Sequence, residues 1–260
     1  MIKRHIVGYT DLHTHTTYCD GRATPEEMVL SAIEKGITTL GLLAHSYVEF
    51  DPDYAIDPER VSEFRAEVYR LREKYKDKIN ILFGIEADYF TTEQYADTDY
   101  VIGSVHYFKD GDEYRNIDNS PPVFIKMVED CFGGDYYAMA ESYYRQVSEI
   151  KERTGAGIVG HFDLVTKFNE GDVLFDTTDE RYRAAWRSAA DKLIAEGLIF
   201  EINTGAIARG RRKAPYPSRE IRDYIRERGG RFILSSDAHF ADKLAYDFDK
   251  YIHLLEGEKE

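Results

Sequence analysis

Residues 5–46, HIVGYTDLHTHTTYCDGRATPEEMVLSAIEKGITTLGLLAHS, contain the pattern that decides the fold class. The apolar runs at 5–13 and 38–46 predict two short strands. Between them, residues 24–36 predict an amphipathic helix that begins with the capping-box sequence TPEE and ends at a glycine. A strand, a helix and a second strand in this order are typical of a βαβ unit, in which the two strands run parallel.

The same alternation of short apolar runs and longer amphipathic stretches continues along the chain. Further strands are expected at 79–89, 99–108, 156–165, 198–206 and 231–240. Further helices are expected at 57–78, 123–132, 136–154, 178–197 and 217–230, and a short helix and a frayed end should follow the last strand. Seven strands, mostly separated by helices, favour a closed α/β barrel that forms one domain over residues 1–260. A doubly wound open sheet is the alternative, although no glycine-rich nucleotide-binding motif follows the first strand.

The composition narrows the class of protein. Hydrophobic residues make up 43% of the chain, which is enough for a sizeable core. Two cysteines make no disulfide framework and no apolar run reaches the length of a membrane span, so we expect a soluble protein of the reducing cytoplasm. The net charge of −14 argues only weakly against nucleic-acid binding, because bound divalent cations could invert the local field of an acidic site.

Six of the eight histidines lie at or just after the carboxyl end of an expected strand, which is the active face of a barrel enzyme. The third strand carries a glutamate at the equivalent position, and an aspartate follows the first strand closely enough to fold back over the site. The candidate metal ligands are therefore His13, His15, Asp20, His45, Glu86, His106, His161, Asp237 and His239. Nine imidazole and carboxylate ligands are too many for one ion, and they suit two or three divalent ions of Zn, Mn or Fe.

The spacing of two pairs supports a metal site. His13 and His15 are two residues apart, so both rings point to one side of an extended chain, and Asp237 and His239 repeat this spacing. The alternative is an ordinary core or surface role, which is the better interpretation for any single histidine. It is a poor interpretation for six histidines at matching strand ends.

Asp11 and Cys19 are weaker candidates for a role at the metal site. Asp11 is either a partner of the metal ligands or a buried hydrogen-bonding residue at a strand end. Cys19 neighbours a ligand only along the chain, so it is expected to be a small, partly buried thiol, with a soft metal ligand as the alternative. His5 and His253 do not fit the strand-end pattern.

The segments DLHTHTTYCDG, LLAHS, GIEAD, IGSVH, GHFD and SSDAH together resemble the PHP (polymerase and histidinol phosphatase) superfamily of metal-dependent phosphoesterases. The resemblance runs from Asp11 to His239 in the family order. It implies a distorted (β/α)7 barrel with the metal site at the carboxyl ends of the strands, and a trinuclear cluster held by the nine residues above. The second motif departs from the TDHD or TEH of many members, since it keeps His45 but lacks the acidic neighbour, and this weighs against the nuclease-like branch.

The segments IGSVHYF, VGHFDLVTKFN and EINTGA…YPS resemble the histidinol-phosphatase branch of this superfamily. The implied activity is the hydrolysis of L-histidinol phosphate to L-histidinol and phosphate, a step of histidine biosynthesis. A hydroxide shared by two ions is the expected nucleophile. We assign catalytic roles to Glu86, Asp237 and His239.

Two cations are candidates for binding the phosphate. Arg209 follows the sixth strand closely, and Lys167 follows the fifth. Residues 211–213 are expected to be a solvated charge run. The expected partner is a small phosphorylated substrate, with no membrane or nucleic-acid partner, and the oligomeric state stays open.

Three other functions remain to be weighed. One is an exonuclease or nucleotide phosphoesterase of the same superfamily, against which the net charge and the second motif count. Another is a non-catalytic, metal-binding regulatory module, against which the complete ligand set counts. An amidohydrolase also uses a His-x-His pair on its first strand, but Glu86 and the final Asp-x-His pair make it a weaker match.

Overall fold

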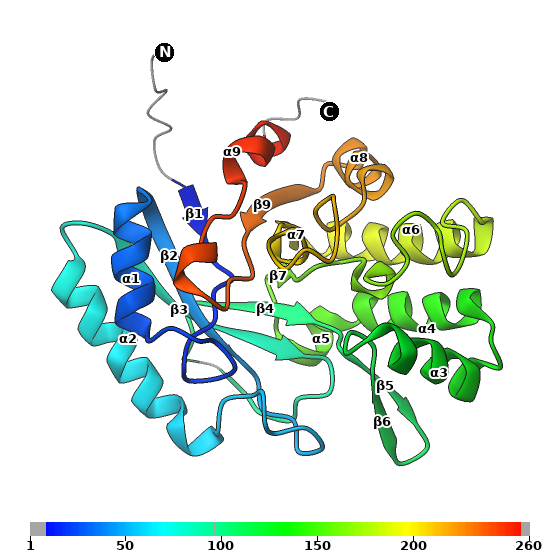
Figure 1. The fold of residues 1–260 in the computed structure, drawn as a ribbon, viewed down its shortest axis with the longest axis horizontal. Coiled ribbons are helices and arrows are strands. Elements are labelled where there is room, and N and C mark those ends of the chain that lie inside the picture. The colour runs from blue at the N-terminus through cyan, green and yellow to red at the C-terminus, as the bar shows by residue number, and fades with distance from the viewer. Residues whose placement is uncertain (1–8, 96, 256–260) are drawn as a thin grey trace.

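A seven-stranded parallel sheet forms the centre of the computed structural model, which describes residues 9–95 and 97–255 (Figure 1). Just beyond the first and last strands, Thr14 pairs with Ala238 in a parallel bridge, and the amide of His15 donates to the carbonyl of Ala238 at 2.8 Å. The sheet is therefore nearly closed, which confirms the expected distorted (β/α)7 barrel. In spatial order the strands are β1 (Tyr9–Asp11), β2 (Ile37–His45), β3 (Asn80–Asp88), β4 (Tyr100–Ser104), β7 (Ile158–Val159), β8 (Ile199–Asn203) and β9 (Arg231–Ser235).

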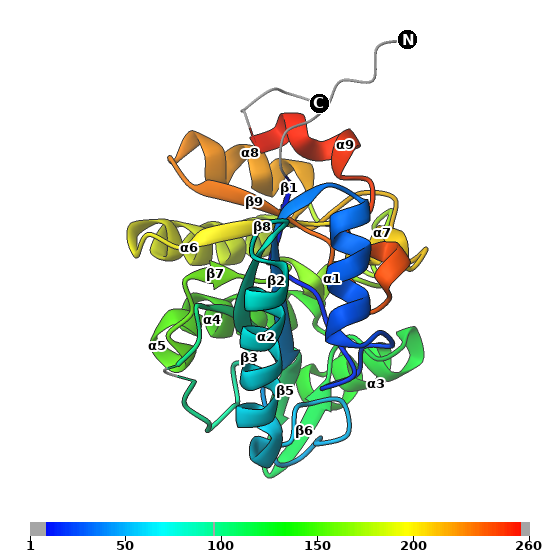
Figure 2. The same ribbon diagram turned by 90° about the vertical axis from the view of Figure 1, so that its left-hand side faces the viewer.

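Helices cover the outside of this barrel in two groups (Figures 1 and 2). The helices α1 and α2 pack on β2 and β3 around one hydrophobic cluster, whereas α3, α4, α6 and α8 enclose a second cluster on the other side. The helices are α1 (Pro25–Glu34), α2 (Val61–Tyr75), α3 (Pro121–Phe132), α4 (Tyr136–Ser148), α5 (Ile150–Thr154), α6 (Glu180–Ala195), α7 (Gly205–Ala208), α8 (Arg219–Glu227) and α9 (Phe248–Tyr251). Short 3₁₀ turns are η1 (Pro58–Arg60), η2 (Leu164–Thr166), η3 (Ala241–Lys243) and η4 (Ile252–Leu255).

The first helix begins as its sequence predicts. The Thr24 side chain accepts a hydrogen bond from the Glu27 amide, and the Glu27 carboxylate accepts one from the Thr24 amide at 2.8 Å. This capping box satisfies amide donors that the first helical turn leaves free. It fixes where α1 starts after the loop that carries the histidine pair.

The expected fourth and fifth strands are shorter than predicted. The fourth ends at Ser104, and β5 (Tyr107–Asp110) pairs with β6 (Glu113–Asn116) in an antiparallel hairpin that the strand pattern did not predict. Gly111 and Asp112 form the two-residue turn of this hairpin, with Gly111 at φ 58°. The fifth strand keeps only Ile158–Val159, because the chain then leaves the sheet towards η2. Residues 5–8 of the first expected strand, and the expected frayed end at 256–260, lie outside the described residues.

A tyrosine fills one end of the barrel interior. Tyr100 donates from its hydroxyl to the carbonyl of Leu12 at 2.6 Å, and its ring lies over Gly41 of β2 and Gly84 of β3. A Cβ atom at Gly84 would lie 2.6 Å from both Cε atoms of this ring, closer than side-chain atoms approach. The two glycines therefore make room for the ring between neighbouring strands.

Replacing Gly84 by alanine is expected to destabilise the fold by about 1–3 kcal/mol, because the added methyl group overpacks the barrel against Tyr100. Urea unfolding measures this loss. The control is Gly157→Ala, since a Cβ atom there meets nothing within 4 Å, and this variant should be as stable as the parent or slightly more so. Equal stability of the two variants would contradict the packing described here.

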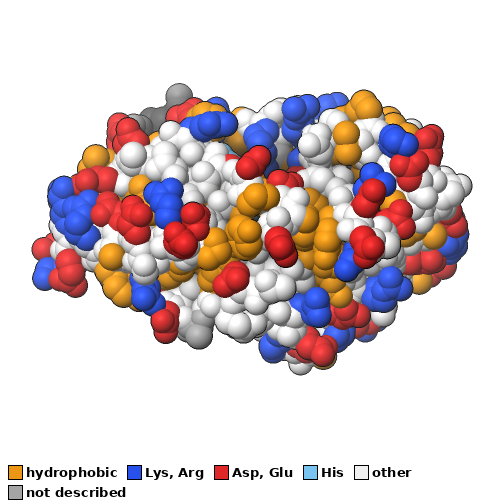
Figure 3. Space-filling view, turned by 90° about the horizontal axis from the view of Figure 1, so that it is seen from below, with side chains coloured by type: hydrophobic (Ala, Val, Ile, Leu, Met, Phe, Trp, Pro, Cys, Tyr) orange, Lys and Arg blue, Asp and Glu red, His pale blue; other side chains and the backbone are white. Residues whose placement is uncertain are grey.

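Among residues 9–95 and 97–255, no helix combines the length and apolar character that crossing a membrane requires. Figure 3 shows one face, on which hydrophobic side chains form a band and acidic and basic side chains are interspersed on both sides of it.

Candidate metal centre

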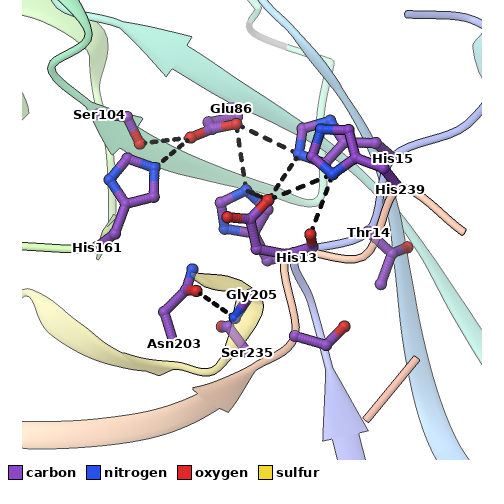
Figure 4. Close-up of polar contacts among 12 residues, drawn as sticks. His13, Thr14, His15, Glu86, Ser104, His161, Asn203, Gly205, Ser235 and His239 are labelled. Carbon is purple, nitrogen blue, oxygen red and sulfur yellow. Dashed lines mark hydrogen bonds and ion pairs between the residues drawn. The ribbon is translucent and has the colours of Figure 1, made fainter. Parts of the chain in front are cut away.

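The structure brings all nine predicted metal ligands together at the carboxyl ends of the strands. Figure 4 shows His13, His15, Glu86, His161 and His239 of this cluster. Each comes from a strand end or from the loop directly after it, so the barrel converts distant sequence positions into one cluster. The histidine pair follows β1, His45 ends β2, Glu86 lies in β3, His106 follows β4, His161 follows β7, and the Asp-x-His pair follows β9. His253 lies on η4, apart from this cluster, and His5 is outside the described residues.

Glu86 lies at the middle of the cluster. Its Oε2 atom is 3.1 Å from Nε2 of His13 and 2.9 Å from Nδ1 of His45. Its Oε1 atom is 3.0 Å from Nε2 of His161 and accepts a hydrogen bond from the Ser104 hydroxyl at 2.7 Å. The two carboxylate oxygens therefore face two different sets of imidazoles.

The candidate ligands fall into three groups that share members. In each group, one donor atom from every residue lies within 4.8 Å of the others. The groups are His13, His15 and Glu86; Glu86, His106 and His161; and His15, Asp20, His45 and His239. Because Glu86 belongs to two groups and His15 to two, the arrangement resembles a row of adjoining sites and suits more than one ion.

The predicted acidic residues of the loops close the cluster. Asp20 folds back as expected, with Oδ2 3.0 Å from Nε2 of His239. Oδ1 of Asp237 lies 3.6 Å from Nε2 of His15. Asp237 has a φ of 49°, an unusual conformation for a residue other than glycine. A Cβ atom on Gly205 would lie 2.7 Å from Cβ of Asp237, so the missing side chain leaves room for this carboxylate.

Several buried atoms of the cluster lack a hydrogen-bond partner among the described residues. They are His13 Nε2, His15 Nε2, Asp20 Oδ1, Glu86 Oε2 and His161 Nδ1. Buried polar atoms are nearly always paired, so such a concentration in one place needs an explanation. Imidazole nitrogens and carboxylate oxygens that converge without partners are the donor set that a divalent transition metal takes up. The residues present therefore fit bound metal ions.

The charge states of Glu86 and His15 suit metal binding. Burial alone would raise the pKa of Glu86, but His13 and His45 outweigh it and hold this pKa well below its usual range. Burial and the neighbouring His239 and His45 lower the pKa of His15 to about 3, so its ring is neutral at pH 7. An ionised carboxylate and a neutral imidazole are the forms that bind metals.

Two carboxylates that the sequence analysis did not single out orient the histidines. Glu201 accepts a hydrogen bond from Nδ1 of His13 at 2.8 Å, and Asp88 lies 3.1 Å from Nδ1 of His106. Each leaves the Nε2 atom of its histidine directed at Glu86. This is the usual support for a metal-binding histidine. The sequence contained one signal for Glu201, because this acidic residue interrupts the apolar run of β8. In the structure the residue is fully buried.

Replacing Glu201 by glutamine is expected to lower activity and metal affinity about 10- to 100-fold, because His13 loses the carboxylate that fixes its ring. Metal titration and phosphate release measure the two effects. Glu34→Gln, at the exposed end of α1, is the control and should behave like the parent. Unchanged metal affinity in the Glu201 variant would exclude this supporting role.

The structure assigns different surroundings to Asp11 and Cys19, the two weaker candidates near the histidine pair. Asp11 is fully buried and accepts hydrogen bonds from the Ser236 hydroxyl at 2.6 Å and from the Ala245 amide, so it ties the two ends of the sheet together. The expectation that Cys19 neighbours a ligand only along the chain is wrong, because its Sγ lies 3.5 Å from Nδ1 of His15. Burial raises the pKa of Cys19 to about 12, so it remains a thiol.

A cavity of about 620 Å³ opens above the cluster and holds both predicted phosphate-binding cations in its wall. Arg209 donates to Oδ2 of Asp237 at 2.8 Å. Lys167 donates to the carbonyl and the carboxylate of Asp118, at 2.7 and 3.0 Å. Both side chains are therefore beside the cluster, and each already has an acidic partner.

The prediction of a solvated charge run at 211–213 is wrong for its middle residue. The Arg212 guanidinium lies 4.3 Å from the ring centroid of Tyr216 and donates to the Thr166 hydroxyl at 2.6 Å. Arg211 and Lys213 are exposed, as expected. Aromatic stacking retains Arg212 because a guanidinium is planar and weakly hydrated.

Comparison with known proteins gives one family match over most of the chain. The PHP domain model matches residues 11–205. A protein of Deinococcus radiodurans named as a probable histidinol-phosphatase is 29% identical over 259 residues, which cover 94% of this chain and 91% of that protein.

Two solved structures have the same fold. A Listeria monocytogenes protein assigned to the histidinol phosphatases superposes with a TM-score of 0.80 at 22% identity, over 93% of this chain and 99% of that one. The histidinol phosphate phosphatase of Lactococcus lactis, solved with zinc, L-histidinol and phosphate, has a TM-score of 0.69 at 20% identity, over 96% and 94% of the two chains.

Proposed function

This chain belongs to the PHP domain family, and on that premise we propose that it is a metal-dependent phosphomonoesterase that hydrolyses L-histidinol phosphate to L-histidinol and phosphate. The observation that carries the proposal is the convergence of nine histidine and carboxylate side chains, seven of which line a cavity of about 620 Å³. This activity would make the chain an enzyme of histidine biosynthesis. The proposal includes a cytoplasmic location, which the free cysteines Cys19 and Cys131 support.

The proposed ligands of two or three divalent ions are the nine clustered residues, with zinc as the first candidate and manganese or iron as alternatives. When bound there, divalent ions supply an activated water and neutralise charge on the phosphoryl oxygens. Glu86 would hold two of the ligand groups at a fixed separation, because one of its oxygens faces each group.

The other residues of the site bind and orient the substrate. Arg209 lies beside Asp237 in the cavity wall, where its guanidinium can donate to phosphoryl oxygens. Lys167 is the second candidate for this contact. His239 is the most exposed of the six clustered histidines, at 19%, and Asp20 lies 3.0 Å from its Nε2 atom. We assign its catalytic role to metal binding at the open side of the cluster, because a nitrogen that binds a metal carries no proton to transfer.

The far wall of the cavity suits an alcohol that carries an amine and an imidazole. Asp51 accepts a hydrogen bond from the Tyr107 hydroxyl at 2.7 Å, and Tyr54 lines the same wall. The Phe50 ring stacks on Tyr114 with 3.6 Å between centroids, which joins the loop after β2 to the β5–β6 hairpin. Carboxylates attract an ammonium group and aromatic faces suit a flat ring, so this wall supports L-histidinol as the leaving group.

A phosphoester panel tests the proposal. The zinc- or manganese-loaded protein is given L-histidinol phosphate, simple alkyl phosphates, nucleoside monophosphates and short oligonucleotides, and phosphate release is measured. We expect the highest kcat/KM for L-histidinol phosphate. A preference for nucleotides would instead favour the nucleotide phosphoesterase, and metal binding without turnover of any ester would favour the regulatory module.

A further inference from the structure

The side chain of Tyr216 presents a buried donor that the fold itself does not use. The residue is 1% exposed, and its hydroxyl has no hydrogen-bond partner within the described part of the chain. Such a group is costly to bury, and buried hydroxyls are normally paired. Tyr216 also lines the cavity above the metal cluster, together with Arg209 and His161. The missing partner is therefore best sought among the molecules that the cavity binds.

The backbone and ring of Tyr216 are held in place from two sides. Its amide donates to the carbonyl of Asn203 at 3.0 Å, and its carbonyl accepts from the Asn203 amide at 2.8 Å. This bridge joins Tyr216 to the carboxyl end of β8. On the ring, the Arg212 guanidinium lies 4.3 Å from the centroid, and Thr166 fixes that guanidinium by a hydrogen bond. A donor held this firmly loses little entropy when it binds a ligand.

The surroundings of the hydroxyl favour an anionic acceptor. The ring centroid is 6.3 Å from that of His161, whose Nδ1 atom also lacks a partner. The Arg212 guanidinium lies over the ring, and Arg209 lines the same cavity. Burial raises the pKa of Tyr216 above its usual range, so the hydroxyl keeps its proton and can donate it in a hydrogen bond.

We propose that the Tyr216 hydroxyl donates a hydrogen bond to a phosphoryl oxygen of the bound substrate, and that it is a catalytic residue of this site. This inference rests on the proposed phosphomonoesterase function. The contact would stabilise charge on the phosphoryl group, because a donor that is already held in place needs no rearrangement during the reaction. Because the product is also an anion, the same donor would bind inorganic phosphate.

The test is calorimetric titration of inorganic phosphate into the metal-loaded protein and its Tyr216→Phe variant. We expect the variant to bind phosphate about 10- to 100-fold more weakly, as for a lost hydrogen bond to a charged group, with kcat/KM reduced by a similar factor. Its metal content should be unchanged. Its melting temperature without phosphate should not fall, because the hydroxyl has no partner to lose. A purely structural tyrosine would give a lower melting temperature and an unchanged phosphate affinity.

The control is Tyr144→Phe, which removes a hydroxyl that lies 3.0 Å from that of Tyr182 in the hydrophobic core. This variant should lose stability and bind phosphate as the parent does. The proposal is wrong if Tyr216→Phe binds phosphate within twofold of the parent, or if the parent binds no phosphate at all. A selective loss of alkyl ester turnover, with p-nitrophenyl phosphate turnover and phosphate binding intact, would also overturn it, because the hydroxyl would then serve the leaving oxygen.

These readouts separate the failure of this inference from that of the proposed function. If L-histidinol phosphate is not the preferred ester but phosphate binding still depends on Tyr216, the substrate assignment fails and the role of the hydroxyl holds. If L-histidinol phosphate is the preferred ester but Tyr216→Phe binds phosphate as the parent does, the substrate assignment holds and the proposed role of the hydroxyl fails.

Discussion

Replacing Glu86 by glutamine is expected to lower phosphoester turnover by about 10³-fold or more and to remove at least one equivalent of metal. The reason is geometric. Glu86 faces imidazoles through both of its oxygens and belongs to two of the three ligand groups, so one change weakens two candidate sites. Glutamine keeps the shape of the side chain but loses the charge, so its amide nitrogen cannot act as the second ligand atom. Phosphate release and elemental analysis of the purified variant measure the two losses.

The matched control is Glu152→Gln, on the exposed face of α5, which should keep both activity and metal. A circular dichroism spectrum equal to that of the parent would show that the Glu86 variant is folded. If the folded variant keeps its full metal content and more than a tenth of the parent activity, Glu86 does not have the bridging role proposed here.

The second large effect is expected on removing the metal. Chelation should abolish activity and lower the melting temperature by about 5–10 °C. A ligand at 100 times its dissociation constant stabilises a protein by about 2.7 kcal/mol, which corresponds to such a shift in a chain of this size. The physical cause is the cluster of buried carboxylates and imidazoles, whose unpartnered atoms lose their proposed ligands.

Scanning calorimetry before chelation, after chelation and after the return of zinc measures this coupling. Both activity and melting temperature should recover when zinc returns. The Glu86→Gln variant should show a smaller chelator-induced shift than the parent, because it holds less metal at the start. A chelated protein that melts at the original temperature and keeps its turnover would exclude a metal centre in this cluster.

Much of the fold and of the candidate site could be predicted from the sequence because both depend on local pattern. Apolar runs followed by histidines identified the strand ends, and parallel strands in a barrel bring their carboxyl ends to one face. The positions of His45 and His161 follow from this argument alone. Asp20 was harder, since its return to the cluster depends on the loop, yet its short separation from His15 limited where it could lie.

The sequence analysis missed roles that depend on contacts outside the local sequence pattern. Glu201 and His13 are 188 residues apart, so no local pattern reports that one orients the other. Arg212 was assigned to solvent because its neighbours are charged, but stacking on Tyr216 outweighs that tendency. The β5–β6 hairpin was missed because β5, which precedes the Gly111-Asp112 turn, also suits the end of a longer strand.

Residues next to the metal site close the barrel, so barrel closure and the metal site involve the same part of the molecule. The hydrogen bond between Asp11 and Ser236 spans 225 residues, and it lies beside the two ligand pairs that follow β1 and β9. The group of Glu86, His106 and His161 needs only β3, β4 and β7, which are neighbours in the sheet. Asp237 and His239 follow β9, so they belong to the cluster only when β9 lies beside β1. An ion held by both ligand pairs would connect the first and last strands, so metal binding and closure of the sheet would stabilise each other.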